Sequence, residues 1–552
     1  MLSALVAHAA AVLLLVQSPA SASKPADKGP PPCVVSGRVV TAADGTPVAS
    51  SRVALVPEHQ RRESQVYAAI SDGSGRFTIS EVPAGRYRFL ATHTGYVDQH
   101  YQSSGDDTGA ILALQAGQEL KDVLFRLTLA AVLTGRVNDE DGEPMALVEV
   151  VALRRPTDEE TEDRDDSPSR RPELLPAGNA QTDDRGQYRI FGLKAGEYYI
   201  KAVDEYEPMG HVIFGSEWEV RQALGTQYAP VYYPGVTQIG QAESLVVRPG
   251  EEAQVDLVLR RIKTVQISGR VIGADGKPAT DVSIWLEEVA GDYGFVQGNE
   301  TDSKGEFKLK GVAPGSYVLH ARQHSSENEA NYHASQKTEV GADNIDSILL
   351  ALGKGVNFLG RLDVSGAGTK FERMFIALTS HVDQTAGAFA RVKKDGTFQL
   401  LDVPDGTFSF SMNGLEEGWY VKSVHLGATD ILANGLEVEK GKGGGTIQVV
   451  VSNGGAELAG LVTQDDKLMI GARVRIIPDP ETRYNRLRTR SANTDQSGRF
   501  SLVGVAPGQY RVIAKASGPN GEDTVASDPK SISLSEHDHK TIGLTVAPPQ
   551  TH

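Results

Sequence analysis

One short pattern recurs along this 552-residue chain and constrains its fold more than any other feature. Its clearest form runs from Asp302 to Leu319: an Asp, a Gly three residues later, an aromatic residue two further on, and then Pro-Gly before a tyrosine. Asp-x-x-Gly predicts a turn, because Asp accepts hydrogen bonds from the following backbone and Gly tolerates positive φ. Phe307 and Leu309 alternate with polar residues, as the residues from Tyr317 onward do, so each run predicts a strand with one buried face. We interpret the unit as an antiparallel hairpin.

The same spacing occurs five times in the chain. Three more copies keep the Asp, both Gly residues, both aromatic residues and their spacing, although the Pro-Gly pair itself recurs only in the last copy. A weaker copy has Lys393 where the Asp should stand. The repeated residues are accounted for by turns and buried strands, so the pattern is a structural signature and includes no catalytic motif. Besides the copy above, the copies are Asp72–Tyr87, Asp183–Tyr198, Lys393–Phe408 and Asp495–Tyr510.

A second repeated element lies upstream of each copy and consists of an apolar residue, a Gly and another apolar residue at a spacing of two. Gly leaves a gap in the buried face of a strand, which predicts the close approach of an aromatic side chain from the facing sheet. The five glycines lie 98, 134, 91 and 100 residues apart. A period near one hundred, with about six or seven short strands in each copy, indicates tandem β-sandwich domains. The glycines are Gly37, Gly135, Gly269, Gly360 and Gly460.

The predicted fold class is therefore all-β, with five β-sandwich domains in an elongated array, because the linkers between copies are short. A flexible Pro-rich leader at 23–32 precedes them. The second copy is the longest, since it contains a charged loop after Pro156 and an aromatic insertion after Val203. The predicted domains are 33–128, 129–260, 261–352, 353–452 and 453–548.

The N-terminus is typical of an exported protein. Leu2–Val16 is an apolar run, and Ala20-Ser21-Ala22 is a small-x-small pattern that suits cleavage before Ser23. We interpret 1–22 as a signal peptide, although Lys and Arg are missing from its first residues; a membrane anchor is the alternative, but the run is short for a span. No later segment is apolar enough to cross a membrane, so no transmembrane segment is expected in the mature chain.

Net charge and cysteine content limit the possible partners of the protein and the ways in which its domains can be stabilised. The formal net charge of −16 argues against nucleic acid or an anionic membrane as the main partner. Cys33 is the single cysteine, so no internal disulfide can form and each domain must depend on its hydrophobic core.

The motifs together resemble a known family. Gly-Arg-Val followed by Asp-Gly-x-Pro, then Thr-Asp-x-x-Gly-x-Phe/Tyr and Pro-x-Gly-x-Tyr, is similar to the carboxypeptidase regulatory-like domain. The resemblance covers roughly residues 33–548 and is weakest in the fourth copy. It implies transthyretin-like (prealbumin-like) sandwiches related to the Ig-like fold. It also implies that the domains are not themselves catalytic, since domains of this type accompany catalytic or membrane modules.

Candidate sites for chemistry are few. His324 and Glu327 match the short zinc-carboxypeptidase motif, but a strand end is the wrong context and a second distant His on an α/β domain is lacking. His537 and His539 have metal-like spacing, and we interpret them as part of a solvated turn. Calcium sites at the Asp turns are not expected, because the alternating oxygen ligands are missing.

Two enzyme families with related sandwiches were also considered. The iron-site tyrosines and histidines of intradiol dioxygenases are not matched in any copy, and neither is the terminal Tyr-Arg-Gly-Ser of transthyretin-like hydrolases. We therefore predict no catalytic residue, no metal and no cofactor.

The aromatic insertion of the second domain is the best candidate for a ligand site. Its exposed rings would form a stacking platform for sugars, and the alternative is local core packing. We expect an exported, non-enzymatic spacer or protein-interaction module of the cell envelope, in the periplasm, at the cell surface or outside the cell. Its partner would be an envelope protein or glycan; the alternative function is carbohydrate or polymer binding. The candidate residues are Trp218, Tyr228, Tyr232 and Tyr233.

Overall fold

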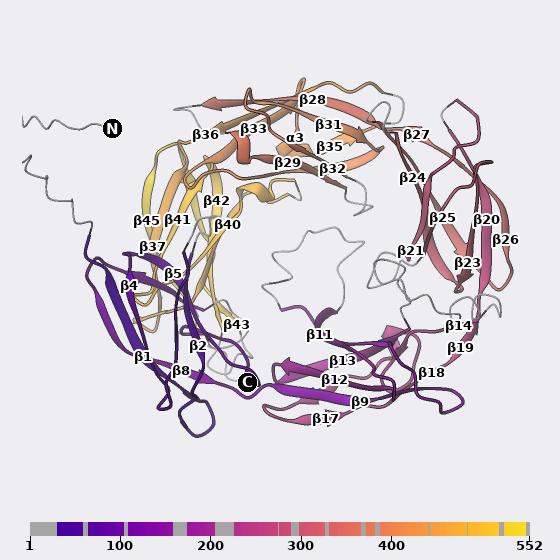
Figure 1. The fold of residues 1–552 in the computed structure, drawn as a ribbon. Helices are drawn as coiled ribbons and strands as arrows, with labels where there is room; N and C mark the ends of the chain where they lie inside the picture. Colours follow the sequence, from indigo (N-terminus) through magenta and orange to yellow (C-terminus); the bar gives the residue numbers. More distant parts are fainter. Residues whose placement is uncertain are drawn as a thin grey trace, which may run out of the picture.

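The chain folds into five β-sandwiches that lie around a ring (Figure 1). The computed structural model describes residues 30–58, 65–103, 109–157, 160, 174–204, 226–273, 275–288, 297–325, 330–365, 371–380, 387–439, 442–482, 484–517 and 524–547. Within these residues almost all regular structure is strand, which confirms the predicted all-β fold class.

Domain 1 shows the topology that the other domains repeat. Its first sheet has the strand order β4-β1-β8, in which β1 and β8 run parallel, and its second sheet has the order β3-β2-β5-β7. The short β6 (Gln99–His100) also pairs with β5. The strands are β1 (Cys33–Thr41), β2 (Arg52–Pro57), β3 (Tyr67–Ile70), β4 (Arg76–Val82), β5 (Gly85–Thr92), β7 (Ile111–Leu114) and β8 (Glu119–Leu127).

Domains 2 and 3 keep this order. In domain 2 the first sheet contains β12, β9, β17 and β18, and the second contains β11, β10, β13, β15 and β16; β14 and β19 pair at its end. In domain 3 the sheets are β23-β20-β26 and β22-β21-β24-β25-β27. The bounds are β9 (Ala131–Asp139), β10 (Glu149–Arg154), β11 (Leu175–Gln181), β12 (Gln187–Leu193), β13 (Gly196–Val203), β14 (Thr226–Tyr228), β15 (Val231–Tyr232), η1 (Ile239–Gln241), β16 (Leu245–Val247), β17 (Glu252–Gln254), β18 (Leu257–Leu259), β19 (Arg261–Lys263), β20 (Val265–Ile272), β21 (Ser283–Glu288), β22 (Gln297–Glu300), β23 (Glu306–Val312), β24 (Gly315–Ser325), β25 (Ala330–Val340), β26 (Ile345–Ala351) and β27 (Gly353–Lys354).

Domains 4 and 5 follow the same plan with additions. In domain 4 an extra strand, β33, extends the first sheet to β31-β28-β36-β33-β34, and the second sheet is β30-β29-β32-β35. In domain 5 the sheets are β38-β37-β41, with β45 on β37, and β40-β39-β42-β43, with β44 on β42. The bounds are β28 (Val356–Ser365), η2 (Phe371–Arg373), β29 (Phe375–Ser380), β30 (Gly387–Arg391), β31 (Thr397–Val403), β32 (Gly406–Asn413), β33 (Tyr420–Leu426), β34 (Thr429–Asp430), α3 (Ile431–Asn434), β35 (Leu436–Val438), β36 (Thr446–Ser452), β37 (Ala456–Gln464), β38 (Lys467–Leu468), β39 (Arg473–Pro478), η3 (Arg486–Arg488), β40 (Arg490–Asn493), β41 (Arg499–Val505), β42 (Gly508–Ser517), β43 (Thr524–Ala526), β44 (Lys530–Leu534) and β45 (His539–Thr545).

The repeated signature is not the hairpin that its alternation suggested. Its two strands, β4 and β5 in domain 1, do not pair; β4 lies in the first sheet and β5 in the second. The turn at Pro83 and Ala84 therefore carries the chain across the core from one sheet to the other. Alternation indicates that each strand has one buried face, but it does not indicate which strand lies beside it. Aromatic residues of the two strands meet across the core: the ring centroids of Phe77 on β4 and Phe89 on β5 lie 6.1 Å apart.

The Asp-x-x-Gly turns have the predicted geometry. Asp302 Oδ1 accepts the backbone N–H of Lys304 at 2.9 Å and of Glu306 at 2.8 Å, while Gly305 has φ of 72°. The same backbone donors hold the pKa of Asp302 below its usual value. Each turn thus uses its carboxylate to satisfy its own backbone, as expected from the sequence.

The repeated Gly of the first strand is required, but for a different reason from the one predicted. Gly37 on β1 lies directly opposite Phe77 on β4, so the aromatic residue comes from the neighbouring strand of the same sheet and not from the facing sheet. A Cβ on Gly37 would lie 2.0 Å from the carbonyl oxygen of Val123 and 2.9 Å from the Phe77 ring. The side chain is excluded at Gly37 mainly by the backbone of the neighbouring strand, and less by the aromatic ring.

The tyrosine of each complete signature anchors its own turn. Tyr317 OH donates to the carbonyl oxygen of Ala313 at 3.0 Å, and Tyr87, Tyr198 and Tyr510 make the same bond to the residue four positions earlier. In the weaker fourth copy, Phe408 occupies this place without a hydroxyl.

Removing one of these hydroxyls should destabilise its domain modestly. We expect Tyr317→Phe to lower the free energy of unfolding of domain 3 by about 1 kcal/mol, because the Ala313 carbonyl loses its donor while the ring stays packed. Urea denaturation of the variant measures this. Phe408→Tyr in domain 4 is the reverse substitution, and it should not weaken its domain if space for the hydroxyl exists at the turn.

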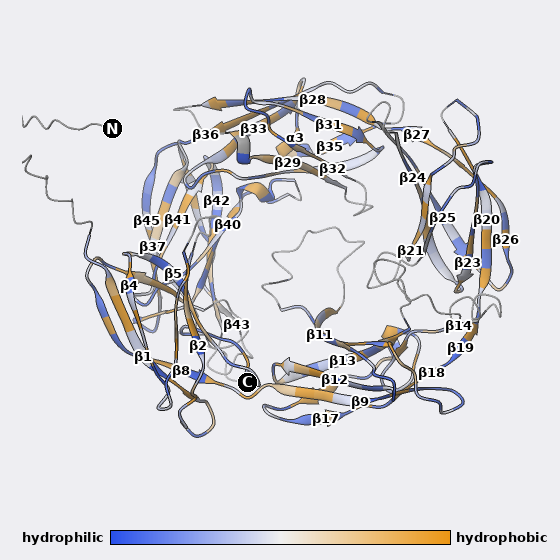
Figure 2. Cartoon of the chain, viewed as in Figure 1, coloured by the Kyte–Doolittle hydropathy of each residue, from blue (hydrophilic) through white to orange (hydrophobic). Residues whose placement is uncertain are grey.

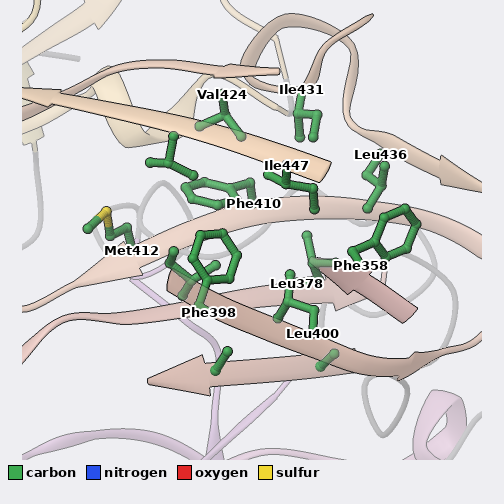
Figure 3. Close-up of a cluster of buried hydrophobic side chains, with 14 of the residues drawn as sticks. Phe358, Leu378, Phe398, Leu400, Phe410, Met412, Val424, Ile431, Leu436 and Ile447 are labelled. Carbon is green, nitrogen blue, oxygen red and sulfur yellow. The ribbon is translucent and has the colours of Figure 1, made fainter. Parts of the chain in front are cut away.

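Each domain has its own core between its two sheets. Along the strands, hydrophobic residues alternate with polar ones (Figure 2). The core of domain 4 is drawn in Figure 3, where Phe398 and Leu400 of β31 pack with Phe410 of β32 and Ile447 of β36. The four side chains are at most 3% exposed. Five separate cores confirm tandem sandwich repeats.

The array is a closed ring and not the elongated array that the short linkers suggested. In Figure 1 the first sheet of each domain lies on the outside of the ring and the second sheet faces its centre. Domain 1 lies against domain 5, so the chain closes on itself. Gln496 binds both backbone groups of Ala113: its Oε1 accepts the N–H at 3.0 Å, and its Nε2 donates to the carbonyl at 2.7 Å.

Other contacts extend this closure. Asn493 Nδ2 donates to the carbonyl oxygen of Gly109 at 2.8 Å, and Ile111 forms a parallel β-bridge with Asp495. Arg86 pairs with Glu58 at 2.6 Å and lies 3.9 Å from Asp495. Linker length alone did not reveal the curvature, because the angle between neighbouring domains is set by side chains at their junctions.

One such junction joins domains 4 and 5 through Glu536. Its Oε1 accepts hydrogen bonds from Tyr420 OH at 2.6 Å, Lys422 Nζ at 3.0 Å and Ser452 Oγ at 3.2 Å. The Tyr420 hydroxyl, and next the Lys422 ammonium, lower the pKa of Glu536 from 4.5 to about 2. The ionised carboxylate is thus the form that connects the two domains.

This junction should weaken in acid. Because the pKa of Glu536 is lower in the folded than in the unfolded chain, its contribution is complete above pH 4.5 and is lost as the pH falls toward about 2. We expect Glu536→Gln to lower the thermal stability of the protein at neutral pH and to leave a smaller difference from wild type at acidic pH. Calorimetry across this pH range measures it, and a difference that grows in acid would contradict the assignment.

Candidate functional site

Tyr228, the first of the predicted ligand residues that the structure describes, belongs to the junction between domains 2 and 3. Arg261 at the start of β19 donates from Nε to Tyr228 OH at 3.1 Å, and its guanidinium carbon lies 5.7 Å from the centre of the Tyr228 ring. Arg261 Nη2 also binds Asp139 at 3.0 Å and Asp141 at 2.9 Å. Tyr228 and the two carboxylates therefore hold the segment that leads into domain 3.

The electrostatics of this junction are those of a structural ion pair. The hydrogen bond to Tyr228, and then that to Asp141, raise the pKa of Arg261 above its ordinary value. Burial acts to raise the pKa of Asp139, but the backbone N–H groups of Glu143 and Asp141 outweigh it and keep the pKa low. Both shifts favour the charged forms of Arg261 and Asp139, as expected of an ion pair that holds two domains together.

Tyr232 is part of a small second core. Its side chain is only 8% exposed and packs with Val151, Leu153 and Leu174 on the ring-facing side of β10. The ammonium of Lys201 lies 5.7 Å from the centre of its ring. The side chain of Tyr232 thus packs on the second sheet of domain 2, which leaves little of its ring for a ligand.

Tyr233 is half-buried against the main core of domain 2, and its N–H donates to the carbonyl of Ile200 at 2.9 Å. Trp218 lies outside the described residues. The three described tyrosines are therefore spread over a domain junction, a second core and the edge of the main core, and the structure does not gather them into one aromatic platform.

The histidine motifs show no metal geometry in the described part of the chain. His539 Nδ1 lies 3.1 Å from Glu457 Oε2, while Asp538 accepts the N–H of Ser535 and closes the predicted turn. Glu327, the partner of His324 in the other motif, lies outside the described residues. Across the described ranges, no group of three or more His, Cys, Asp or Glu side chains could hold a metal ion.

An open groove of about 790 Å³ lies on domain 2 and is lined chiefly by residues of its outer sheet. Its carboxylates already have partners: Asp183 accepts the N–H of Arg185 and Gln187, and Asp256 accepts the N–H of Arg136 at 2.8 Å. The groove can donate and accept hydrogen bonds, but it presents no acid–base pair for catalysis.

Comparison with known proteins identifies the class of domain. Residues 34–127 and 266–344, which form the greater part of domains 1 and 3, match the family model of the carboxypeptidase regulatory-like domain. In these two domains the match agrees with the family that the motifs suggested. Domains 2, 4 and 5 share the topology without a match to that model. A search of curated proteins finds no match to the chain.

Solved structures with similar folds are remote. The streptococcal ancillary pilin is 12% identical and covers 58% of this chain and 99% of its own, with a TM-score of 0.22. The minor pilin of Streptococcus agalactiae is 16% identical over 40% of this chain and 96% of its own, with a TM-score of 0.19. The major pilin subunit of Bacillus cereus is 10% identical and covers 59% of this chain and 100% of its own, with a TM-score of 0.14. Such low scores carry no argument about function.

Reasoning from the sequence missed the residues that close the ring. Gln496 and Asn493 lie 383 and 384 positions from their partners in domain 1. Both lie within two residues of Asp495 in the fifth signature, and the other copies have Gly73, Asp184, Ser303 and Lys394 at the position of Gln496. Because this position differs in every copy, the repeat itself gave no signal of the contact. Among the described residues, no helix is long and apolar enough to cross a membrane.

Proposed function

We propose that this protein is an exported, non-enzymatic scaffold of the cell envelope whose closed ring of β-sandwiches presents its ring-facing sheets to a partner. The observation that carries the proposal is the closure of domain 1 on domain 5 by Gln496, Asn493 and Arg86. A closed ring restricts the motion of its domains relative to one another. Surfaces from distant parts of the sequence are thereby kept in a constant arrangement, as binding sites require.

Export follows from the signal-like N-terminus and places the partner in the periplasm, at the cell surface or outside the cell. The non-enzymatic role is supported by the carboxylates of the outer groove and of the domain junctions, since each is engaged by backbone or arginine donors. The partner is an envelope protein or glycan.

Proximity labelling in the cells that make the protein tests this role. A labelling enzyme fused to the C-terminus should mark a small set of envelope proteins, and mass spectrometry of the N-terminus should find Ser23 first. Labelling of cytoplasmic proteins, or retention of residues 1–22, would contradict export. A matched strain carrying Gln496→Glu should mark fewer of the same partners, because the ring opens; an unchanged set would contradict the scaffold role.

Carbohydrate binding by the insertion of domain 2 is the second candidate. It is supported by the half-exposed ring of Tyr233 and by the aromatic content around Trp218. A glycan array tests it with Trp218→Ala and Tyr233→Ala. Tyr232→Ala is unsuitable, since removing a buried ring disturbs the fold. Binding that survives both substitutions would remove this candidate.

A further inference from the structure

Ring closure brings two sheet edges together. Ile111, the first residue of β7, bridges to Asp495, which follows β40 by two residues. Strand β7 belongs to the second sheet of domain 1, and β40 is at the edge of the second sheet of domain 5. Both sheets face the centre of the ring (Figure 1). They therefore form neighbouring parts of one surface, although almost four hundred residues separate them in the sequence.

That surface is cationic on its ring-facing side. On β2 the side chains of Val53 and Leu55 are buried, so Arg52 points the other way. On β39, Val474 is buried in the core, so Arg473 and Arg475 lie on the opposite, ring-facing side of the sheet, where Arg475 is only 9% exposed. We name this surface the arginine face, and the same alternation on β5 and β42 completes it: Arg52, Arg88, Arg473, Arg475, Arg511 and Lys515.

Two of these cations have no carboxylate partner among the described residues. Arg52 and Arg88 form no ion pair or side-chain hydrogen bond with any described residue, whereas the neighbouring Arg86 pairs with Glu58. The Nε atoms of Arg88 and Arg511 are buried and have no acceptor. Arg511 forms two long ion pairs, with Asp479 at 3.9 Å and with Glu481 at 3.8 Å, and neither carboxylate accepts a hydrogen bond from its Nε. A buried guanidinium N–H without an acceptor is costly, and an oxyanion would satisfy it.

The cations are also crowded. Burial, and then the charge of Arg475, lower the pKa of Arg473. Like charges this close repel, and the protein as a whole has a net charge of −16, so the arginine face is a local exception to its acidic surface. Arginine in place of lysine favours ligands with planar or tetrahedral oxyanions, because the guanidinium fork donates two parallel hydrogen bonds.

We propose that the arginine face binds an anionic polysaccharide through its carboxylate, sulfate or phosphate groups. A flexible polymer chain can enter the inside of a ring, whereas a flat bilayer meets only its outer surfaces. The inference names the ligand class of the proposed scaffold and rests on that function. Because it concerns one face alone, its failure leaves export and ring closure intact.

Fluorescence anisotropy with labelled heparin and labelled polygalacturonate tests the proposal on the mature chain. We expect binding to at least one of the two, with affinity that falls as salt rises. Heparin carries sulfates as well as carboxylates, whereas polygalacturonate carries carboxylates alone. Binding to heparin alone would therefore assign sulfate as the recognised group, and binding to both would assign carboxylate. We expect Arg88→Gln/Arg511→Gln to weaken binding about tenfold, since two charge-assisted contacts are lost. Arg88→Lys/Arg511→Lys keeps the two positive charges but lacks the planar guanidinium groups. Its affinity should therefore lie between that of the wild type and that of the glutamine variant.

The matched control is Arg76→Gln/Arg126→Gln, which removes two exposed arginines from the outer sheet of domain 1 and changes the net charge equally. This control should bind as wild type does. Equal loss in both double variants, no binding of either polymer at low salt, or stronger binding to DNA or to anionic vesicles would overturn the proposal. Circular dichroism and scattering on each variant verify that the fold and ring persist.

Discussion

Replacing Gly135 with Ala should unfold domain 2. Gly135 on β9 lies between β12 and the last strands of the sheet, and a Cβ there would stand 1.8 Å from the carbonyl oxygen of Val255 and 2.9 Å from the ring of Tyr188. Relief requires the backbone of Val255 to move, which breaks the pairing that closes the sandwich. We expect a loss of about 3 kcal/mol or more from the free energy of unfolding of the domain.

Hydrogen exchange followed by mass spectrometry measures this loss domain by domain, because the five cores are separate. Gly240→Ala is the matched control: it changes the same residue type in the same domain, at a position where a Cβ meets no atom within 4 Å. We expect the control to exchange as wild type does. Normal protection of domain 2 in Gly135→Ala would show that the repeated Gly is not a steric requirement.

Opening the ring requires only one changed side chain. Gln496→Glu removes the donor to the carbonyl of Ala113 and puts a carboxylate oxygen against it, beside the existing charge of Asp495. The lost bond and the repulsion should cost about 1–3 kcal/mol of closure energy. Domains 1 and 5 should then separate for part of the time, while each sandwich remains folded.

Pulsed electron resonance between spin labels at Thr78 and Lys467 reports the separation of domains 1 and 5. Both sites are exposed, and Cys33 is buried and does not compete for the label. We expect one narrow distance distribution in wild type and a broader, longer one in Gln496→Glu. Gln509→Glu makes the same chemical change elsewhere in domain 5 and should keep the narrow distribution. A broad distribution in wild type would mean that the ring is not held closed.

The turns of this fold could be predicted from the sequence, because the residues that form each turn are neighbours in the chain. Asp302 bonds the backbone two and four residues on, and Gly305 takes its positive φ within the same turn. The period of the glycines gave the number of sandwiches for a similar reason, since each copy must build its own core. Which strands pair with each other could not be predicted in this way. Alternation indicates that Phe77 and Tyr87 are buried in a core, but it does not reveal that they lie on opposite sheets.

The arrangement of domains and the fate of the aromatic insertion could not be predicted, because both depend on contacts between distant residues. Tyr228 looked like a ligand residue until Arg261, 33 positions later, was found bonded to it. Tyr232 is covered by a second core whose members come from separate strands. Gln496 reads as an ordinary turn residue, and its significance becomes visible only with Ala113 beside it.

Small-angle X-ray scattering of the mature chain tests the central claim, ring closure, most directly. If domain 1 lies on domain 5, the measured profile and maximum dimension should match those calculated from the closed ring, and Gln496→Glu should increase the radius of gyration. A wild-type profile that fits an extended row of five sandwiches, with a maximum dimension several domains long and no change in the variant, would contradict the account.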